Sequence, residues 1–366
     1  MQTWTTSAVL PPRVVLSGAT VYATQGSVYA LQADTGVLHQ RYQIQGAAYP
    51  TVMENVMYVN VNYLFDHTLQ ALHLRDGSLL WSYQAEGSLS YAPIVLEDII
   101  YSSSRGIIFA LHVQDGSLLW QYTVNSKFSA FPTIVEKVVY VSPSVNPPLT
   151  PSVYALHSRN GTLLWQTPIS NSTSFPRTVR GGVMYISTYK ECSALSTRDG
   201  SSIREHKITG RICSPPIVEN GTIYISLVTS RDNVSFFASN QPDPMEPQED
   251  IFIYALRADD GSLLWKQQIG SNTGAGDPTT PAVTHDAVYV GADDGFLYAL
   301  RTDDDTPLWS YKTGGTLLSS PIVANRVVYV GANDGYVYAL RASDGVLLWQ
   351  TFVSVAVTAA SSISIR

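Results

Sequence analysis

Charged residues are scarce in this chain. Asp, Glu, Lys and Arg make up only 14% of its 366 residues, and the formal net charge is −7. Because the sequence has no basic cluster that could contact a phosphate backbone, it excludes nucleic acid as a partner. It also lacks a run of about 18 apolar residues, so we expect no membrane-spanning helix. Residues 1–10 have neither a basic start nor a long apolar stretch, and we expect no signal peptide there.

Cysteine and helix-like patterns are also lacking. The two cysteines, Cys192 and Cys213, fit no metal-binding spacing, so we expect buried or half-buried thiols and no metal site. Apolar residues nowhere recur with the period of a helix, whereas Tyr, which favours strands, is the commonest aromatic residue with 22 copies. The composition therefore favours an all-β protein.

The sequence does contain a repeat, seen best in the twelve-residue stretch Tyr338–Trp349 (YALRASDGVLLW). Two of its copies end in Gln40 and Arg204 instead of Trp, and a third has Asp305 instead of Gly. A spacing of roughly 40–45 residues is that of one four-stranded propeller blade. The eight copies begin 39 to 61 residues apart, at Tyr29, Gln70, Phe109, Tyr154, Ser193, Tyr254, Tyr298 and Tyr338.

Each repeat reads as four short strands, A to D, joined by tight turns. In the last copy, Asp344-Gly345 suits the turn between strands C and D, because Asp can hydrogen-bond its own backbone and Gly can take a positive φ. Such sheets bury both faces only when they stack in a ring. We therefore predict a single domain over residues 1–366, an eight-bladed β-propeller of four-stranded antiparallel blades. The blades are expected at about 12–45, 50–84, 93–124, 132–169, 176–208, 216–268, 281–311 and 321–352.

The end of the chain offers a way to close the ring. Residues 354–366 follow blade 8, and Ser361–Arg366 falls where a further strand A would fall. We predict that this segment pairs with blade 1, because closure removes exposed strand edges. The N-terminal segment also offers a strand A, so the sequence leaves open which end closes the ring.

Long loops between strands B and C indicate where a partner binds. We expect such inserts in blade 2 (Asn62–Thr68), blade 4 (Ser142–Pro151) and blade 6 (about Leu227–Asp250). The B–C hairpins and D–A connections share one face of a propeller, and varied loops on a rigid scaffold usually carry binding. We expect a protein or peptide partner on this face. The blade 6 insert supplies the predicted contact residues Phe236, Phe237, Asp243 and Glu246.

The repeat resembles the tryptophan-docking motif of pyrroloquinoline-quinone (PQQ) type eight-bladed propellers. Ala339, Gly345 and Trp349 occupy its first, seventh and eleventh positions. The resemblance implies that each Trp packs between adjacent blades against the turn glycine of its neighbour, as a structural part and not as a cofactor stack. The predicted docking residues are Trp81, Trp120, Trp165, Trp265, Trp309 and Trp349.

This family contains enzymes and non-catalytic scaffolds. The dehydrogenases of the family that the repeat resembles bind PQQ and Ca²⁺ at the channel mouth, through cationic side chains and oxygen ligands. In several of these enzymes a pair of adjacent cysteines forms a disulfide over the cofactor. This chain has no such pair, and its D–A segments are mostly neutral. We therefore expect no cofactor and no catalytic residue. The alternative is a quinoprotein dehydrogenase or small-molecule binder using the channel-mouth residues Tyr91, Lys127, Phe131, Phe175, Arg177, Arg211 and Asp277.

The favoured interpretation is the non-catalytic branch, which includes the lipoprotein scaffold of outer-membrane protein assembly and sensor propellers of bacterial kinases. The acidic pairs, such as Asp259-Asp260, lack the later Glu of a calcium loop and read as turns. We expect a monomeric propeller. The sequence leaves open its compartment, although the family is often extracytoplasmic, and whether the chain is part of a longer protein.

Overall fold

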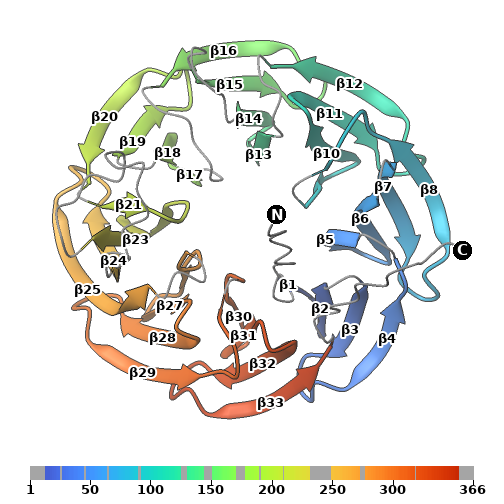
Figure 1. Ribbon diagram of the computed structural model, residues 1–366. Coiled ribbons are helices and arrows are strands. Elements are labelled where there is room, and N and C mark those ends of the chain that lie inside the picture. The colour runs from blue at the N-terminus through green and yellow to red at the C-terminus, as the bar shows by residue number, and fades with distance from the viewer. Residues whose placement is uncertain are drawn as a thin grey trace, which may run out of the picture.

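The computed structural model describes residues 13–24, 27–44, 47–63, 66–89, 92–124, 130–143, 151–169, 178–188, 191–208, 210–230, 249–272, 277–317 and 319–353. Within these ranges every regular element is a β-strand, and eight antiparallel sheets stand around a central opening (Figure 1). The prediction of an all-β, eight-bladed propeller is confirmed. Helices long and apolar enough to cross a membrane are absent from this part of the chain.

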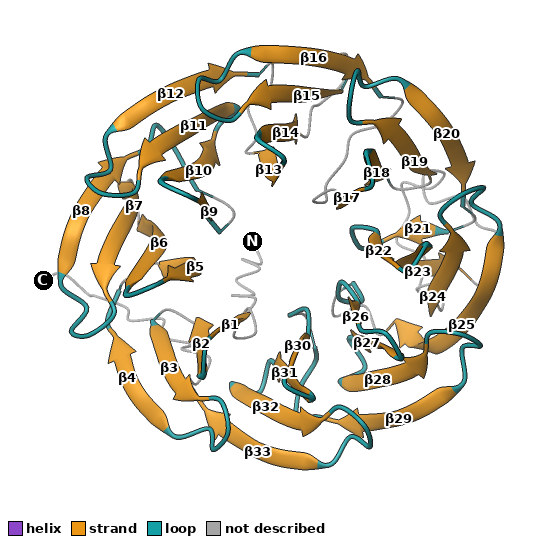
Figure 2. Ribbon diagram, turned by 180° about the vertical axis from the view of Figure 1, so that it is seen from behind, coloured by secondary structure: helices purple, strands orange, loops and turns teal. Residues whose placement is uncertain are grey.

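Each blade is a meander that runs from the centre of the ring to its rim. The first four blades contain β1 (Arg13–Ser17), β2 (Thr20–Thr24), β3 (Val28–Gln32), β4 (Leu38–Tyr42), β5 (Ala47–Met53), β6 (Val56–Tyr63), β7 (Asp66–His73), β8 (Leu79–Gln84), β9 (Ile94–Leu96), β10 (Ile99–Ser104), β11 (Ile107–His112), β12 (Leu118–Thr123), β13 (Ala130–Val135), β14 (Val138–Pro143), β15 (Ser152–His157) and β16 (Leu163–Pro168). Strands A lie innermost and strands D outermost in both views (Figures 1 and 2).

The second half of the ring repeats this plan. It contains β17 (Thr178–Arg180), β18 (Val183–Ser187), β19 (Glu191–Ser196), β20 (Ser202–Lys207), β21 (Arg211–Ile212), β22 (Ile217–Glu219), β23 (Thr222–Ser230), β24 (Glu249–Arg257), β25 (Leu263–Asn272), β26 (Ala282–Val283), β27 (Ala287–Gly291), β28 (Phe296–Arg301), β29 (Pro307–Lys312), β30 (Ile322–Ala324), β31 (Val327–Gly331), β32 (Tyr336–Arg341) and β33 (Leu347–Phe352). Blade 6 differs from the others because β21 and β22 both pair with β23.

The structure corrects two of the predicted inserts. In blade 2, β6 and β7 stay paired as far as Tyr63 and Asp66, so the expected long connection is a tight hairpin between longer strands. In blade 6, β23 and β24 stay paired out to Ser230 and Glu249, inside the predicted loop. The ends of these strands lie in segments rich in polar residues, where pairing with the neighbouring strand decides whether a strand continues. The blade 4 insert at residues 144–150 lies outside the described residues.

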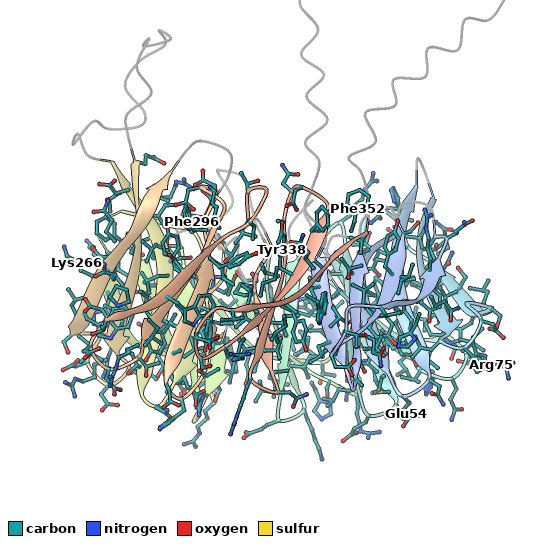
Figure 3. The ribbon with its side chains drawn as sticks, turned by 90° about the horizontal axis from the view of Figure 1, so that it is seen from below. Glu54, Arg75, Lys266, Phe296, Tyr338 and Phe352 are labelled. Atoms are coloured by element: carbon teal, nitrogen blue, oxygen red, sulfur yellow. The ribbon has the colours of Figure 1, made fainter. Side chains whose placement is uncertain are left out.

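The two faces of the disc carry different turns. Glu54, in the A–B turn of blade 2, and Arg75, in its C–D turn, lie on the same face (Figure 3). We call this the turn face, and the opposite face, which carries B–C hairpins and D–A connections, the loop face. The ends of strands C and D around Phe296 and Phe352 lie toward the loop face.

Blade 1 is built from consecutive strands near the start of the chain. Its innermost strand is Arg13–Ser17, which pairs with β2 along its length. The position beside β2 that we predicted for Ser361–Arg366 is therefore occupied by β1. Residues 354–366 themselves lie outside the described residues. Within the described chain, packing of blade 8 against blade 1 closes the ring.

The core consists of eight separate layers, one between each pair of neighbouring blades. Between blades 3 and 4, for example, Tyr101, Ile108 and Trp120 pack against Val139, Val141 and Leu156, and each of these side chains is buried. A sheet with apolar side chains on both faces needs a neighbour on each side, and the ring supplies both.

One hydrogen bond recurs at all eight junctions. In each case a side chain of strand D donates to a backbone carbonyl of the next blade, three residues after the first alanine of that repeat. Six donors are the predicted tryptophans, through Nε1: Trp81 to Val113 (2.9 Å), Trp120 to Ser158 (2.7 Å), Trp165 to Thr197 (3.0 Å), Trp265 to Thr302 (2.9 Å), Trp309 to Ala342 (2.9 Å) and Trp349 to Ala33 (2.9 Å).

The two worn repeats keep the hydrogen bond with other donors. The hydroxyl of Tyr42 donates to the Leu74 carbonyl at 2.5 Å, and the guanidinium of Arg204 donates to the Ala258 carbonyl at 3.0 Å. Rings also cover the turn glycines: a Cβ placed on Gly116 would lie 2.5 Å from Trp81 Cε3. At the junction of blades 5 and 6 the imidazole of His206 covers the turn glycine instead of an indole.

Asp305 is the one exception to glycine in these turns, and it has the same left-handed backbone, with φ of 58°. A side chain in this conformation costs up to about 1–2 kcal/mol, and Asp tolerates it better than most residues. We expect Asp305→Gly to raise the free energy of unfolding by about 0.5–1 kcal/mol, measured by thermal and urea denaturation. Asp303→Gly, in the same turn but without a positive φ, is the control and should not stabilise. A loss of stability in Asp305→Gly would contradict this account.

Candidate functional site

The structure describes the side chains of two of the seven residues predicted at the channel mouth, Arg211 and Asp277. The backbone of Phe131 lies in β13. The other four, Tyr91, Lys127, Phe175 and Arg177, lie outside the described residues. The predicted partner contacts of the blade 6 insert do so as well: Phe236, Phe237, Asp243 and Glu246.

Arg211 and Asp277 come together as an ion pair. Arg211 lies in β21, and its Nη1 is 2.7 Å from Oδ1 of Asp277, in the connection between blades 6 and 7. Its Nη2 is 3.8 Å from Oε2 of Glu249 at the start of β24. The guanidinium is 35% exposed and Glu249 13% exposed. Arg211 is therefore neutralised by two carboxylates and is not an open anion site.

Cys213 lies beneath this ion pair. Its Sγ donates to the carbonyl of Arg211 at 3.2 Å. Burial, with the nearby Asp277 carboxylate as a further cause, raises the pKa of the Cys213 thiol to about 12. Burial alone raises the pKa of Cys192 to about 12. Both thiols are free and buried, and a protonated buried thiol is a poor nucleophile and metal ligand.

Hydroxyl groups of the D–A connections hold the loop face together. The Oγ1 of Thr279 accepts a hydrogen bond from the Gly291 amide at 2.8 Å, and its carbonyl accepts one from the Ser226 hydroxyl at 3.0 Å. In blade 8, the hydroxyl of Ser319 donates to the Gly331 carbonyl at 2.8 Å. Through these hydrogen bonds, Thr279 and Ser319 fix the D–A connections to the B strands of the adjoining blades. The sequence showed them only as neutral residues before the proline that opens strand A.

The acidic hairpins of blades 7 and 8 bind tyrosine and backbone groups. Asp294 accepts hydrogen bonds from the Phe296 amide at 2.9 Å and from the Tyr298 hydroxyl at 2.6 Å. Asp334 accepts the corresponding bonds from the Tyr336 amide and the Tyr338 hydroxyl. Sequence reasoning missed these pairs, although a Tyr four residues after each Asp was a usable signal. These carboxylates have the partners expected of turn residues.

The described donor set does not fit PQQ with calcium. The quinone anion would need several convergent cations, whereas Arg211 is already paired with Asp277 and Glu249. Calcium would need several oxygen ligands around one point. Among the described residues, no group of three His, Cys, Asp or Glu side chains could hold a metal ion.

Eight antiparallel blades, joined at six of the eight junctions by docked tryptophans whose indoles donate to the next blade, define a PQQ-like eight-bladed β-propeller. The sequence profile of the family described as outer membrane protein assembly factor BamB matches residues 2–145, 150–243 and 249–365. The chain therefore belongs to this family. A comparison with curated proteins found no match.

Solved structures share the fold at low sequence identity. BamB from Moraxella catarrhalis is 16% identical, with a TM-score of 0.64, over 92% of this chain and 94% of the other. The computationally designed Ika8 protein is 13% identical, with a TM-score of 0.69, over 94% and 97%. Quinohemoprotein alcohol dehydrogenase from Comamonas testosteroni is 13% identical, with a TM-score of 0.69, over 92% and 73%. At these identities the likeness establishes the fold alone.

Proposed function

We propose that this chain is a non-catalytic propeller that binds a protein partner on its loop face, through the blade 6 insert. The observation that carries the proposal is the length of the blade 6 strands. β23, β24 and β25 have 9, 9 and 10 residues, against 5, 6 and 6 for the corresponding strands of blade 7. The extra residues lie on the loop side, where this sheet reaches beyond its neighbours (Figure 3).

The extension is built to hold its shape. Leu227, Val228 and Ile251 are buried within it, and β21 pairs with its inner edge through Arg211 and Ile212. The ion pairs of Arg211 with Glu249 and Asp277 join this base to both adjoining connections. A loop displayed on a rigid sheet loses less conformational entropy on binding than a loop on a mobile stem. The family name, an assembly factor, agrees with a protein that works by holding other proteins.

Insert residues 231–248 are proposed to make the contacts, with Phe236 and Phe237 as apolar anchors and Asp243 and Glu246 as charged ones. Aromatic anchors surrounded by polar residues are typical of binding hot spots. We propose that the protein acts without a cofactor, because Arg211, the described cation of the predicted mouth, is already paired with Asp277 and Glu249.

The test is to replace residues 231–248 with a short Gly-Ser linker and to quantify partner recovery by cross-linking and affinity purification. We expect loss of a stoichiometric protein partner, with the thermal midpoint unchanged because the base sheet remains. Replacement of residues 144–150 in blade 4 is the matched control and should retain the partner. Equal recovery by both variants would contradict the proposed site.

A calorimetric titration with PQQ, with and without Ca²⁺, tests the cofactor part. We expect no heat at millimolar ligand. Calcium-dependent binding tighter than about 10 μM, roughly 7 kcal/mol, would overturn the non-catalytic assignment.

A further inference from the structure

Blades 7 and 8 have the same hairpin between strands B and C. In blade 7, Asp294 accepts a hydrogen bond from the Phe296 amide at 2.9 Å, and in blade 8, Asp334 accepts one from the Tyr336 amide at 3.0 Å. In both hairpins the glycine that follows the Asp donates a backbone hydrogen bond of 3.0 Å across the turn. Because the two backbones follow the same course, side chains at matching positions can be compared directly.

A lysine ammonium lies against the hairpin of blade 7. Lys312, at the end of β29, is paired in register with Phe296 on β28. Its Nζ lies 4.6 Å from the centroid of the Phe296 ring and donates a hydrogen bond to the backbone carbonyl of Asp294. The face of an aromatic ring and a carbonyl oxygen both carry partial negative charge, so together they hold one cation.

Blade 8 has the same acceptors but a phenylalanine at the position of the lysine. Phe352 pairs with Tyr336 as Lys312 pairs with Phe296. A phenyl ring cannot donate a hydrogen bond, so strand D of blade 8 supplies no side-chain donor to the carbonyl of Asp334. Phe352 supplies a further ring instead. Its centroid lies 5.1 Å from that of Tyr336, and 47% of Phe352 is exposed.

Two tyrosines extend this pair of rings toward blade 7. The centroid of the Tyr338 ring lies 6.1 Å from that of Tyr336. Tyr311 of blade 7, where the corresponding residue of blade 6 is Gln267, lies 6.1 Å from Tyr338 between ring centroids. All three tyrosines pack at the junction of blades 7 and 8. We call Tyr311, Tyr338, Tyr336 and Phe352 the aromatic row.

We propose that the aromatic row and the carbonyl of Asp334 bind the protonated side chain of a lysine from a partner protein. The ammonium lies against the rings of Tyr336 and Phe352 and donates to the Asp334 carbonyl, just as one ammonium contacts both a ring and a carbonyl in blade 7. Phe352 lies toward the loop face (Figure 3). The inference therefore rests on the proposed function, and it names a chemical group that the partner on this face presents.

The chemistry of the site selects a primary ammonium over other groups. Aromatic ring faces attract a cation more strongly than a neutral apolar side chain of the same size. The carbonyl needs an N–H donor, which a quaternary ammonium lacks. The carboxylate of Asp334, which accepts a hydrogen bond from the Tyr338 hydroxyl, adds a negative charge beside the row and disfavours an anionic occupant.

The probe is a short glycine–serine peptide with blocked ends and one central lysine, titrated to millimolar concentration and followed by saturation-transfer difference NMR. Two control peptides have norleucine, which is neutral, or trimethyl-lysine, which cannot donate, in place of the lysine. The variant Phe352→Lys supplies the ammonium from the chain itself, as blade 7 does. Thr123→Lys adds the same charge at the corresponding position of blade 3 and is the matched control. Both substituted side chains are exposed, so the fold should be retained, which circular dichroism verifies.

We expect Phe352→Lys to bind the lysine peptide at least about fivefold more weakly than the unchanged chain, and Thr123→Lys to differ by less than about twofold. Both control peptides should bind the unchanged chain at least about threefold more weakly than the lysine peptide does. Equal losses in the two variants would show attraction to overall charge and overturn the proposal. Equal binding of the norleucine or the trimethyl-lysine peptide would also overturn it, because the site would then not select a primary ammonium.

Replacement of residues 231–248 separates this inference from the proposed role of the blade 6 insert. The lysine peptide should bind that variant as it binds the unchanged chain, and its loss there would overturn the inference. Partner recovery through the insert without peptide binding would contradict the aromatic row alone, and peptide binding without an insert-dependent partner would contradict the insert alone. Peptide binding that requires removal of residues 354–366 would also overturn the proposal, because the occupant would then be the chain's own tail.

Discussion

Trp120→Ala is expected to lower the free energy of unfolding by about 3–5 kcal/mol. The indole is 8% exposed and packs at the junction of blades 3 and 4 among Tyr101, Val139 and Leu156. Its removal leaves a void there, because the sheets on both sides are held by their own hydrogen bonds and cannot collapse into it. It also leaves the Ser158 carbonyl without the indole donor, which lies 2.7 Å away.

Trp120→Phe separates the two contributions. The smaller ring keeps most of the apolar contact but cannot donate to Ser158, so we expect a loss of about 1–3 kcal/mol. Urea denaturation followed by far-ultraviolet circular dichroism measures both variants, since the substitution changes the fluorescence itself. A loss below about 1 kcal/mol for Trp120→Ala would contradict the structural role of the docked indole.

Gly161→Ala, at the other side of the same junction, is expected to cost at least about 3 kcal/mol. Gly161 has φ of +67°, a conformation that strains an alanine, and a Cβ there would lie 2.6 Å from Trp120 Cε3. Strain and overlap act together, because the buried indole has no space into which to move.

Gly221→Ala is the matched control. Gly221 has φ of +73°, but nothing lies within 4 Å of the position of its Cβ. It should lose only the backbone term, about 1–2 kcal/mol. The difference between the two variants, measured under the same conditions, is the energy of the overlap with Trp120. Equal losses would show that backbone strain alone explains why glycine occurs in these turns.

The architecture could be predicted because every blade repeats the same local pattern. Asp-Gly turns and alternating apolar strands determine each hairpin, and an eightfold repeat leaves few ways to bury both faces of each sheet. The extents of β6, β7, β23 and β24 were predicted less well. Their ends run into segments rich in polar residues, and a strand there depends on pairing with a neighbour more than on composition.

The candidate site could be predicted only in part. Arg211 and Asp277 are two of the seven residues that the sequence predicts at the channel mouth, but their pairing joins residues 66 positions apart and depends on closure of the ring. The residues that replace the docking tryptophan in two repeats were harder still to predict. The sequence shows Gln40 and Arg204 where Trp is expected, but not that Tyr42 and His206, two residues further along the same strand face, cover the neighbouring glycines.

The ring closes through eight junctions of one kind, so the protein can lose one junction without releasing a blade. The first strand, β1, contacts β5 on one side and β31 on the other, so every blade is held twice. In an open array, one failed junction separates the blades into two groups. In a closed ring, one failed junction leaves every blade attached, and a blade is released only when a second one fails. The blade 5–6 junction has Arg204 and His206 in place of an indole. A closed ring tolerates such a substituted junction because the seven other junctions still hold every blade.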